Sequence, residues 1–202
     1  MRKCKAIIAG LISTVLFAGC AKMPESLDAA SVKEQTAYIR EDGSLQIAYS
    51  EDFNEPYYSI DGLKEFIKEE CRDYNDEKGD EVVSLSSITL SDKKAKAVLT
   101  FKDDKAYEDF SLRAEGSDIK IYSPEESKEC FDLSFYKYKG KKDETVKGSE
   151  VIDSTKMEII EANGPLVLET YGKLRYYTAG SPTDSHRISI AENESAVVVI
   201  NK

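Results

Sequence analysis

The chain has 202 residues and a formal net charge of −10, so it is long enough for one ordinary domain or two small ones. An acidic body repels the phosphate backbone, so nucleic acid is not an expected partner. The sequence has one histidine and lacks both a paired-cysteine motif and a glycine-rich phosphate loop. We therefore expect neither a metal site nor a cofactor.

Residues 1–19 have the organisation of a secretory signal peptide. Three of the first five residues are basic, and the fourteen residues 6–19 carry no charge. This run is too short to cross a membrane as a helix, which needs about 20 residues. It ends Leu16-Phe17-Ala18-Gly19-Cys20 and resembles the bacterial lipobox, with Phe17 where that pattern prefers Leu. We therefore predict cleavage before Cys20 and a diacylglycerol on its sulfur.

This lipid is expected to hold the protein on the extracellular face of the cell membrane, because two or three acyl chains give stable anchoring. Cleavage leaves 183 residues and takes the net charge from −10 to −13, since three basic residues are removed. Such a body is repelled by anionic headgroups. Residues 20–35 are polar and show neither hydrophobic period, so we expect a lipidated tether there and ordered structure from residue 36.

Residues 36–115 carry the signals of a hairpin, a helix, a second hairpin and a second helix. Asp42-Gly43 lies between two β-prone runs and is typical of a hairpin turn. A second hairpin is expected over residues 83–102, followed by a short helix that Asp103 or Asp104 caps. The simplest packing is an antiparallel sheet of two hairpins with two helices on one face, so the expected fold class is α+β.

The first of these helices is predicted to begin at Ser59-Ile60-Asp61, which offers N-cap side chains, and to continue to about Asn75. Its apolar residues recur at helical spacing along one stripe, and charged residues such as Glu69 lie on the opposite side. The stripe consists of Leu63, Phe66, Ile67, Cys71 and Tyr74. Phe66 lies in the middle of the stripe and is therefore expected to be a core residue.

The region 116–202 is predicted to be rich in β structure, because the helical period disappears and strand-like runs recur between turn residues. These runs cover residues 119–122, 131–138, 156–161, 166–171, 173–178, 187–190 and 196–200. The pattern is compatible with two arrangements. The region either extends the first sheet or forms a separate small sandwich or roll.

Two cysteines, Cys71 and Cys130, remain after Cys4 leaves with the signal peptide and Cys20 is lipidated. In an exported protein such a pair is a candidate disulfide, and closing a loop of about 60 residues would contribute on the order of 4 kcal/mol. In the alternative, Cys71 is a small buried hydrophobic residue on the helix and Cys130 is a loop thiol.

The sequence offers no convincing catalytic or calcium-binding constellation. The only histidine, His186, directly follows Asp184 and Ser185, which are too close in sequence to form a hydrolytic triad with it. Residues 73–84 are similar to a calcium loop, but Lys78 occupies the place that needs Gly and Ser84 the place that needs Glu. We therefore do not expect an enzyme, and a carboxylate-based hydrolase is the last alternative.

Tyrosine is abundant, with twelve residues and no tryptophan. Two adjacent pairs, Tyr57-Tyr58 and Tyr176-Tyr177, are candidate ligand contacts. Neighbours in a strand point to opposite faces, so each pair is expected to give one core ring and one exposed ring. An exposed tyrosine can stack on a sugar or contact a peptide, although tyrosines also pack within ordinary sheets.

Several of these segments together resemble a known group of proteins. They are the lipobox, Asp42-Gly43, the run from Glu51 to Tyr58, the helical run from Leu63 to Ile67, and the run from Gly172 to Tyr177. The combination is similar to lipoproteins of uncharacterised function from anaerobic gut Gram-positive bacteria. This resemblance implies a Gram-positive cell surface and carries over no catalytic residue.

Two functions follow as hypotheses. The first is an interaction or envelope-structural module that contacts another protein or the cell wall. The second is a small-ligand or glycan-binding lipoprotein that uses exposed tyrosines. A deep cleft lined by tyrosine and carboxylates would favour the second, and a flat surface or an exposed sheet edge would favour the first.

Overall fold

The computed structural model describes residues 26–112, 119–141, 144–153 and 155–202. Within these ranges the protein is a mixed α+β structure, mostly β, with thirteen strands and three α-helices. The predicted α+β class is therefore confirmed. The predicted signal peptide and Cys20 lie outside the described residues.

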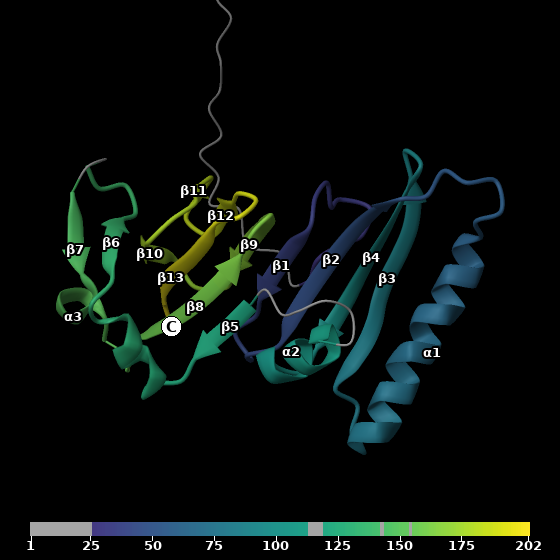
Figure 1. Ribbon diagram of the computed structural model, residues 1–202, viewed down its shortest axis with the longest axis horizontal. Coiled ribbons are helices and arrows are strands. Elements are labelled where there is room, and N and C mark those ends of the chain that lie inside the picture. Colours follow the sequence, from purple (N-terminus) through teal and green to yellow (C-terminus); the bar gives the residue numbers. More distant parts are fainter. Residues whose placement is uncertain (1–25, 113–118, 142–143, 154) are drawn as a thin grey trace, which may run out of the picture.

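The larger of the two sheets has seven strands (Figure 1). Only the β1–β9 pair is parallel. The order of the strands is β11 (Ser181–Pro182), β12 (Arg187–Ile190), β9 (Leu166–Thr170), β1 (Thr36–Ile39), β2 (Leu45–Asp52), β4 (Lys94–Phe101) and β3 (Val83–Ser91). Three strands from the C-terminal region thus extend the sheet that the first four strands begin, so that region is not a separate sandwich.

The remaining strands form a second, antiparallel sheet of six strands. Their order is β5 (Ile119–Tyr122), β8 (Met157–Asn163), β13 (Ser195–Asn201), β10 (Leu174–Tyr177), β6 (Ser134–Lys137) and β7 (Thr145–Lys147). A 3-10 helix (Glu126–Cys130) precedes β6, and the short helix α3 (Gly148–Val151) follows β7. After β8 the chain crosses to the seven-stranded sheet for β9 and returns for β10. It crosses again for β11 and β12 and returns for β13.

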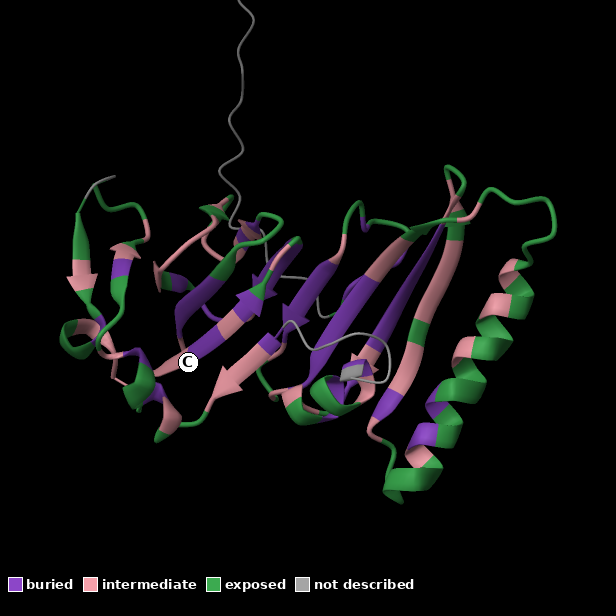
Figure 2. Ribbon diagram, in the orientation of Figure 1, coloured by how far each residue is buried: buried purple, intermediate pink, exposed green. Residues whose placement is uncertain are grey.

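One central core joins both sheets to helices α1 (Ile60–Lys78) and α2 (Asp104–Leu112). Fully buried residues come from both sheets, among them Ile47 and Phe101 from the first and Ile160 and Val198 from the second. Tyr74 of α1 adds a buried ring. Burying one such side chain contributes roughly 1.5–3 kcal/mol. Figure 2 shows this burial concentrated on the central strands.

The opposite face of the seven-stranded sheet is covered by an irregular segment, residues 26–34, which we call the strap. Leu27, Ala29 and Val32 of the strap are buried against Tyr38, Ala48 and Val98 of strands β1, β2 and β4. The Leu27 N–H also donates to Gln46 Oε1 at 2.7 Å. The prediction of a tether over residues 20–35 is therefore wrong for the strap, because apolar residues that follow no regular period can still be buried.

Helix α1 is capped at both ends but is buried only in its C-terminal half. Ser59 accepts the Gly62 N–H at 3.1 Å, as the sequence predicts, and Gly79 ends the helix with a φ of +69°. Cys71 and Tyr74 are the buried residues, whereas Phe66 is 58% exposed. The expectation that Phe66 is a core residue is wrong. A helical stripe identifies one face of a helix, but it does not fix how far along the helix that face meets the core.

Candidate functional site

A groove of about 620 Å³ separates the N-terminal half of α1 from strands β2 and β4. Its floor consists of Tyr49, Ala95, Ala97 and Leu99, and one wall consists of Leu63, Phe66 and Ile67 of α1. Phe53, Tyr57 and Tyr58 close one end, and we call the whole feature the aromatic groove. Figure 2 shows α1 exposed along this half. The groove is therefore a part of the helix–sheet interface that the described residues do not fill.

The loop between β2 and α1 positions the aromatic rings at the end of the groove. Phe53 is fixed by its N–H, which donates to Lys93 O of the β3–β4 turn at 2.7 Å. The Phe53 and Tyr58 rings have centroids 4.7 Å apart, and Tyr57 meets Tyr58 edge to face at 5.0 Å. Tyr57 is nevertheless 77% exposed and Tyr58 45%. These rings support one another and leave apolar surface open to solvent.

The rim of the groove is acidic. Glu51 and Asp52 line it where β2 ends, and Asp52 meets Lys94 at 3.2 Å in an exposed ion pair. On the outer side of α1, Lys68 donates to Glu65 at 2.9 Å, and this hydrogen bond holds the pKa of Glu65 below its usual range. Exposed pairs of this kind contribute little to stability. The groove itself is lined by two carboxylates, Glu51 and Asp52, which lie beside its apolar floor.

The structure brings only one of the two predicted tyrosine pairs to this site. Tyr57 and Tyr58 both lie in the groove and both are exposed, because they belong to a loop and not to a strand. Tyr176 and Tyr177 lie on β10 in the other sheet, and both are half-buried. Tyr176 packs on the cluster around Phe135, and Tyr177 packs on the central core. The expectation of one core ring and one exposed ring is therefore wrong for both pairs.

Cys71 and Cys130 are free, buried thiols in two different hydrophobic clusters. The candidate disulfide between them is not formed, so the alternative of two unpaired cysteines holds, with Cys130 buried as well. Burial raises the pKa of Cys71 to about 11, and it also raises the pKa of Cys130. Both side chains act as small hydrophobic residues.

Neither the groove nor the histidine loop holds a recognisable catalytic set. His186 places Nδ1 3.0 Å from Thr170 O, and its backbone N–H donates to Asp184. The groove is lined by apolar side chains, tyrosine and serine hydroxyls, and two carboxylates. Within the described ranges no group of three or more His, Cys, Asp or Glu side chains could hold a metal ion. The groove is suited to binding an apolar surface.

Sequence reasoning missed Phe53, Leu63 and Phe66 as site residues. The only available signal was their nearness to Tyr57 and Tyr58, because apolar side chains next to a helix start are normally assigned to the core.

None of the described helices combines the length and apolar character that crossing a bilayer requires. No protein-family model, curated protein or solved structure matches the chain.

Proposed function

We propose that the protein is a lipid-anchored extracytoplasmic interaction module whose aromatic groove binds an apolar, basic-flanked segment of a partner protein. The observation that carries this proposal is the 58% exposure of Phe66 in the middle of the apolar stripe of α1. Contiguous exposed apolar surface marks interaction sites in soluble domains. Large aromatic side chains are also the residues that anchor protein interfaces.

The shape of the groove favours a peptide segment as the occupant. One wall is a helix and the floor is a sheet, so a peptide segment lying between them would contact both and fill the space that the described residues leave open. Leu63, Ile67 and Leu99 give this surface an aliphatic character, which complements leucine-like or phenylalanine-like side chains. Such contacts remove apolar area from water at about 25 cal/mol per Å².

Charge favours basic residues on either side of that segment. Glu51 and Asp52 lie on the rim, and the whole chain carries a formal charge of −10. Complementary charge speeds association and selects among partners, and this effect weakens as salt increases. We therefore expect the affinity for the partner to fall with ionic strength.

Glycan binding is the second candidate, because the exposed Tyr57 ring and the nearby carboxylates could contact a sugar. The tyrosines and carboxylates of the groove match what this candidate requires. It ranks second because most of the remaining lining, Leu63, Phe66, Ile67 and the alanines of β4, offers no hydrogen bonds to sugar hydroxyls. The anchor in this proposal is the lipid on Cys20, supported by the signal-peptide pattern and by the resemblance to Gram-positive lipoproteins.

The test places a photo-crosslinking benzoylphenylalanine at Phe66 of the full chain in intact cells. Glu69, which is exposed and paired with Arg72 on the outer side of α1, is the matched control position. We expect a discrete protein adduct from position 66 that is absent from position 69 and is lost when Leu63→Glu is added. The adducted segment, made as a synthetic peptide, should lose about tenfold or more in affinity with Phe66→Ala.

Equal adducts from positions 66 and 69 would contradict the groove as the binding site. Adducts that carry only glycan, together with affinity of the chain for that glycan, would establish the second candidate in place of the first.

A further inference from the structure

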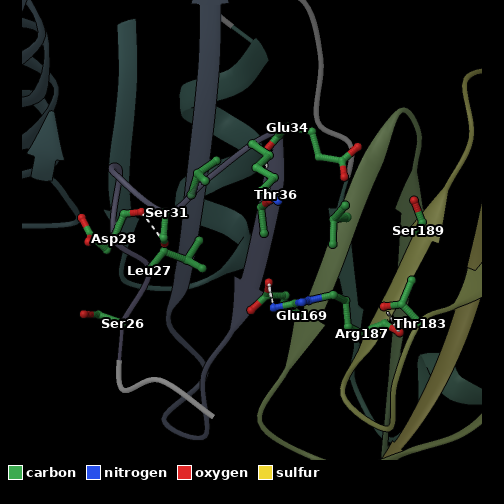
Figure 3. Close-up of a pocket in the computed structure, with 13 residues that line it drawn as sticks. Ser26, Leu27, Asp28, Ser31, Glu34, Thr36, Glu169, Thr183, Arg187 and Ser189 are labelled. Atoms are coloured by element: carbon green, nitrogen blue, oxygen red, sulfur yellow. Dashed lines mark hydrogen bonds and ion pairs between the residues drawn. The ribbon is translucent and has the colours of Figure 1, made fainter. Parts of the chain in front are cut away.

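A second cavity, of about 480 Å³, lies between the strap and the outer face of strands β9 and β12 (Figure 3). We call it the strap pocket. This face of the seven-stranded sheet is opposite to the one that carries the aromatic groove, because Leu99 and Ile47 point toward the core while Tyr38 and Val98 point toward the strap. The strap pocket is therefore separate from the groove.

The floor of the strap pocket contains a charged pair that is only partly satisfied. Glu169 on β9 and Arg187 on β12 are direct cross-strand neighbours, and Glu169 Oε1 lies 2.6 Å from Arg187 Nη2. Figure 3 shows the two side chains pointing toward each other between the strap and β12. The Glu169 side chain is only 7% exposed. A buried carboxylate of this kind is costly unless its oxygens accept hydrogen bonds.

Two buried atoms of this pair have no hydrogen-bond partner among the described residues, namely Glu169 Oε2 and Arg187 Nε. One is an acceptor and the other is a donor. Buried polar atoms in folded proteins are nearly always paired, so exceptions at a cavity indicate a group that completes them. The two atoms belong to one ion pair, so a single ligand group that both donates and accepts could serve both.

We propose that the strap pocket binds a small, neutral, polyhydroxylated ligand of about monosaccharide size. A hydroxyl is the simplest group that donates to Glu169 Oε2 and accepts from Arg187 Nε. The hydroxyls of Ser189, on the same floor, and of Ser26, at the margin, offer further contacts of the same type. The cavity volume falls within the range of about 300–1,000 Å³ that is typical of small-molecule sites.

The two unpaired atoms of the strap pocket disfavour ionic ligands. A carboxylate has no donor for Glu169 Oε2, and an ammonium group has no acceptor for Arg187 Nε. A purely apolar ligand would bury the two unpaired atoms further without pairing them. A neutral ligand that carries hydroxyl groups therefore matches this pocket best.

The test is saturation-transfer NMR on the purified full chain. Glucose, N-acetylglucosamine and ribitol are the neutral probes, and acetate and ethylamine are the charged ones. We expect saturable binding of at least one neutral probe and none of either charged probe. Glu169→Met should weaken that binding about tenfold or more, which is the loss expected for a hydrogen bond to a charged group.

A second variant keeps the test decisive if Glu169→Met does not fold. Ser189→Val removes a floor hydroxyl and adds volume while leaving the ion pair intact, and it should weaken binding at least about tenfold. Glu158→Gln is the matched control, because Glu158 Oε2 is also buried without a partner among the described residues but lies outside the strap pocket. This control and Tyr57→Ala should leave binding unchanged.

Three results would overturn the proposal: no neutral probe binds, binding survives both pocket variants, or acetate or ethylamine binds in place of the neutral probes. Failure of the groove to bind a partner would not change any of these outcomes, since the groove and the pocket lie on opposite faces of the sheet.

Discussion

Asn75, in the last turn of α1, holds Val83 at the first position of β3 through a reciprocal pair of hydrogen bonds. Asn75 Nδ2 donates to Val83 O at 2.8 Å, and Asn75 Oδ1 accepts the Val83 N–H at 3.0 Å. The same oxygen also accepts the Val82 N–H at 2.9 Å. This contact fixes the C-terminal end of α1 to the sheet and leaves the other end free to form a wall of the aromatic groove.

Replacing Asn75 with alanine should therefore destabilise the fold. Three hydrogen bonds are lost, and two backbone N–H groups and one carbonyl lose their partner, so we expect a cost of about 2–4 kcal/mol. Urea unfolding measures it. Asp76→Ala is the control, because Asp76 is exposed and should change the free energy of unfolding by less than about 0.5 kcal/mol. Equal effects of the two changes would contradict the contact.

The two ends of the α1 stripe should differ sharply in their effect on stability. Tyr74→Ala should cost about 3–5 kcal/mol, because the Tyr74 ring is 1% exposed and packs edge to face on Phe110. Phe66→Ala should cost less than about 1 kcal/mol, since its side chain is mostly in water. Thermal and urea unfolding of both variants provide the comparison, and a large loss with Phe66→Ala would place that ring in the core.

The strap should behave as part of the folded body. Leu27→Ala removes a side chain that is 8% exposed, and we expect it to cost about 2–4 kcal/mol. Lys33→Ala is the control within the same segment, because Lys33 is exposed and should have little effect. Unfolding of the full chain measures both. A Leu27→Ala variant as stable as the wild type would restore the view of this segment as a tether.

The two buried thiols should resist alkylation until the protein unfolds. At pH 8 little thiolate forms at Cys71, whose pKa burial raises to about 11, and the site is also closed to reagent. Mass spectrometry after iodoacetamide treatment should show both Cys71 and Cys130 labelled in urea and neither labelled in the native chain. Two peptides linked through Cys71 and Cys130, with a mass lower by two hydrogen atoms than their sum, would demonstrate the disulfide instead.

The raised pKa of Cys71 also determines how its contribution to the free energy of unfolding depends on pH. The unfolded thiol ionises near its ordinary pKa of 9.0, before the folded thiol does, so rising pH favours the unfolded state. The contribution of Cys71 is therefore complete below pH 9.0 and is lost as the pH rises toward about 11. Urea unfolding at a series of pH values should show a larger loss in the wild type than in Cys71→Ala, which keeps the similar contribution of Cys130.

Local signals in the sequence predicted many of the elements, though not β7, α3 or β11, and they did not predict the long-range contacts. Asp42-Gly43 marks the β1–β2 turn, and Ser59 marks the start of α1, because turns and caps depend on neighbouring residues. The parallel pairing of β1 with β9 joins segments far apart in sequence and leaves no local trace. The strap pocket depends on that pairing, since it brings Glu169 beside the strap.

The aromatic groove could be predicted only in part, because it also depends on contacts between segments far apart in the sequence. The stripe on α1 and the tyrosines at 57 and 58 are visible in the sequence, but the angle at which α1 leaves the sheet is not. That angle follows from tertiary contacts such as the Asn75–Val83 pair and the hydrogen bond from the Tyr74 hydroxyl to Asp109 at 2.9 Å.

The strap also sets how far the folded body can reach from a membrane. Ser26 follows Cys20 by six residues, a stretch that spans at most about 20 Å even when fully extended. With the lipid that the sequence predicts on Cys20, the margin of the strap pocket would be held within roughly two nanometres of the bilayer surface. A ligand that reaches the pocket would then have to enter the thin aqueous layer directly above the headgroups, where long or rigid wall polymers have little room.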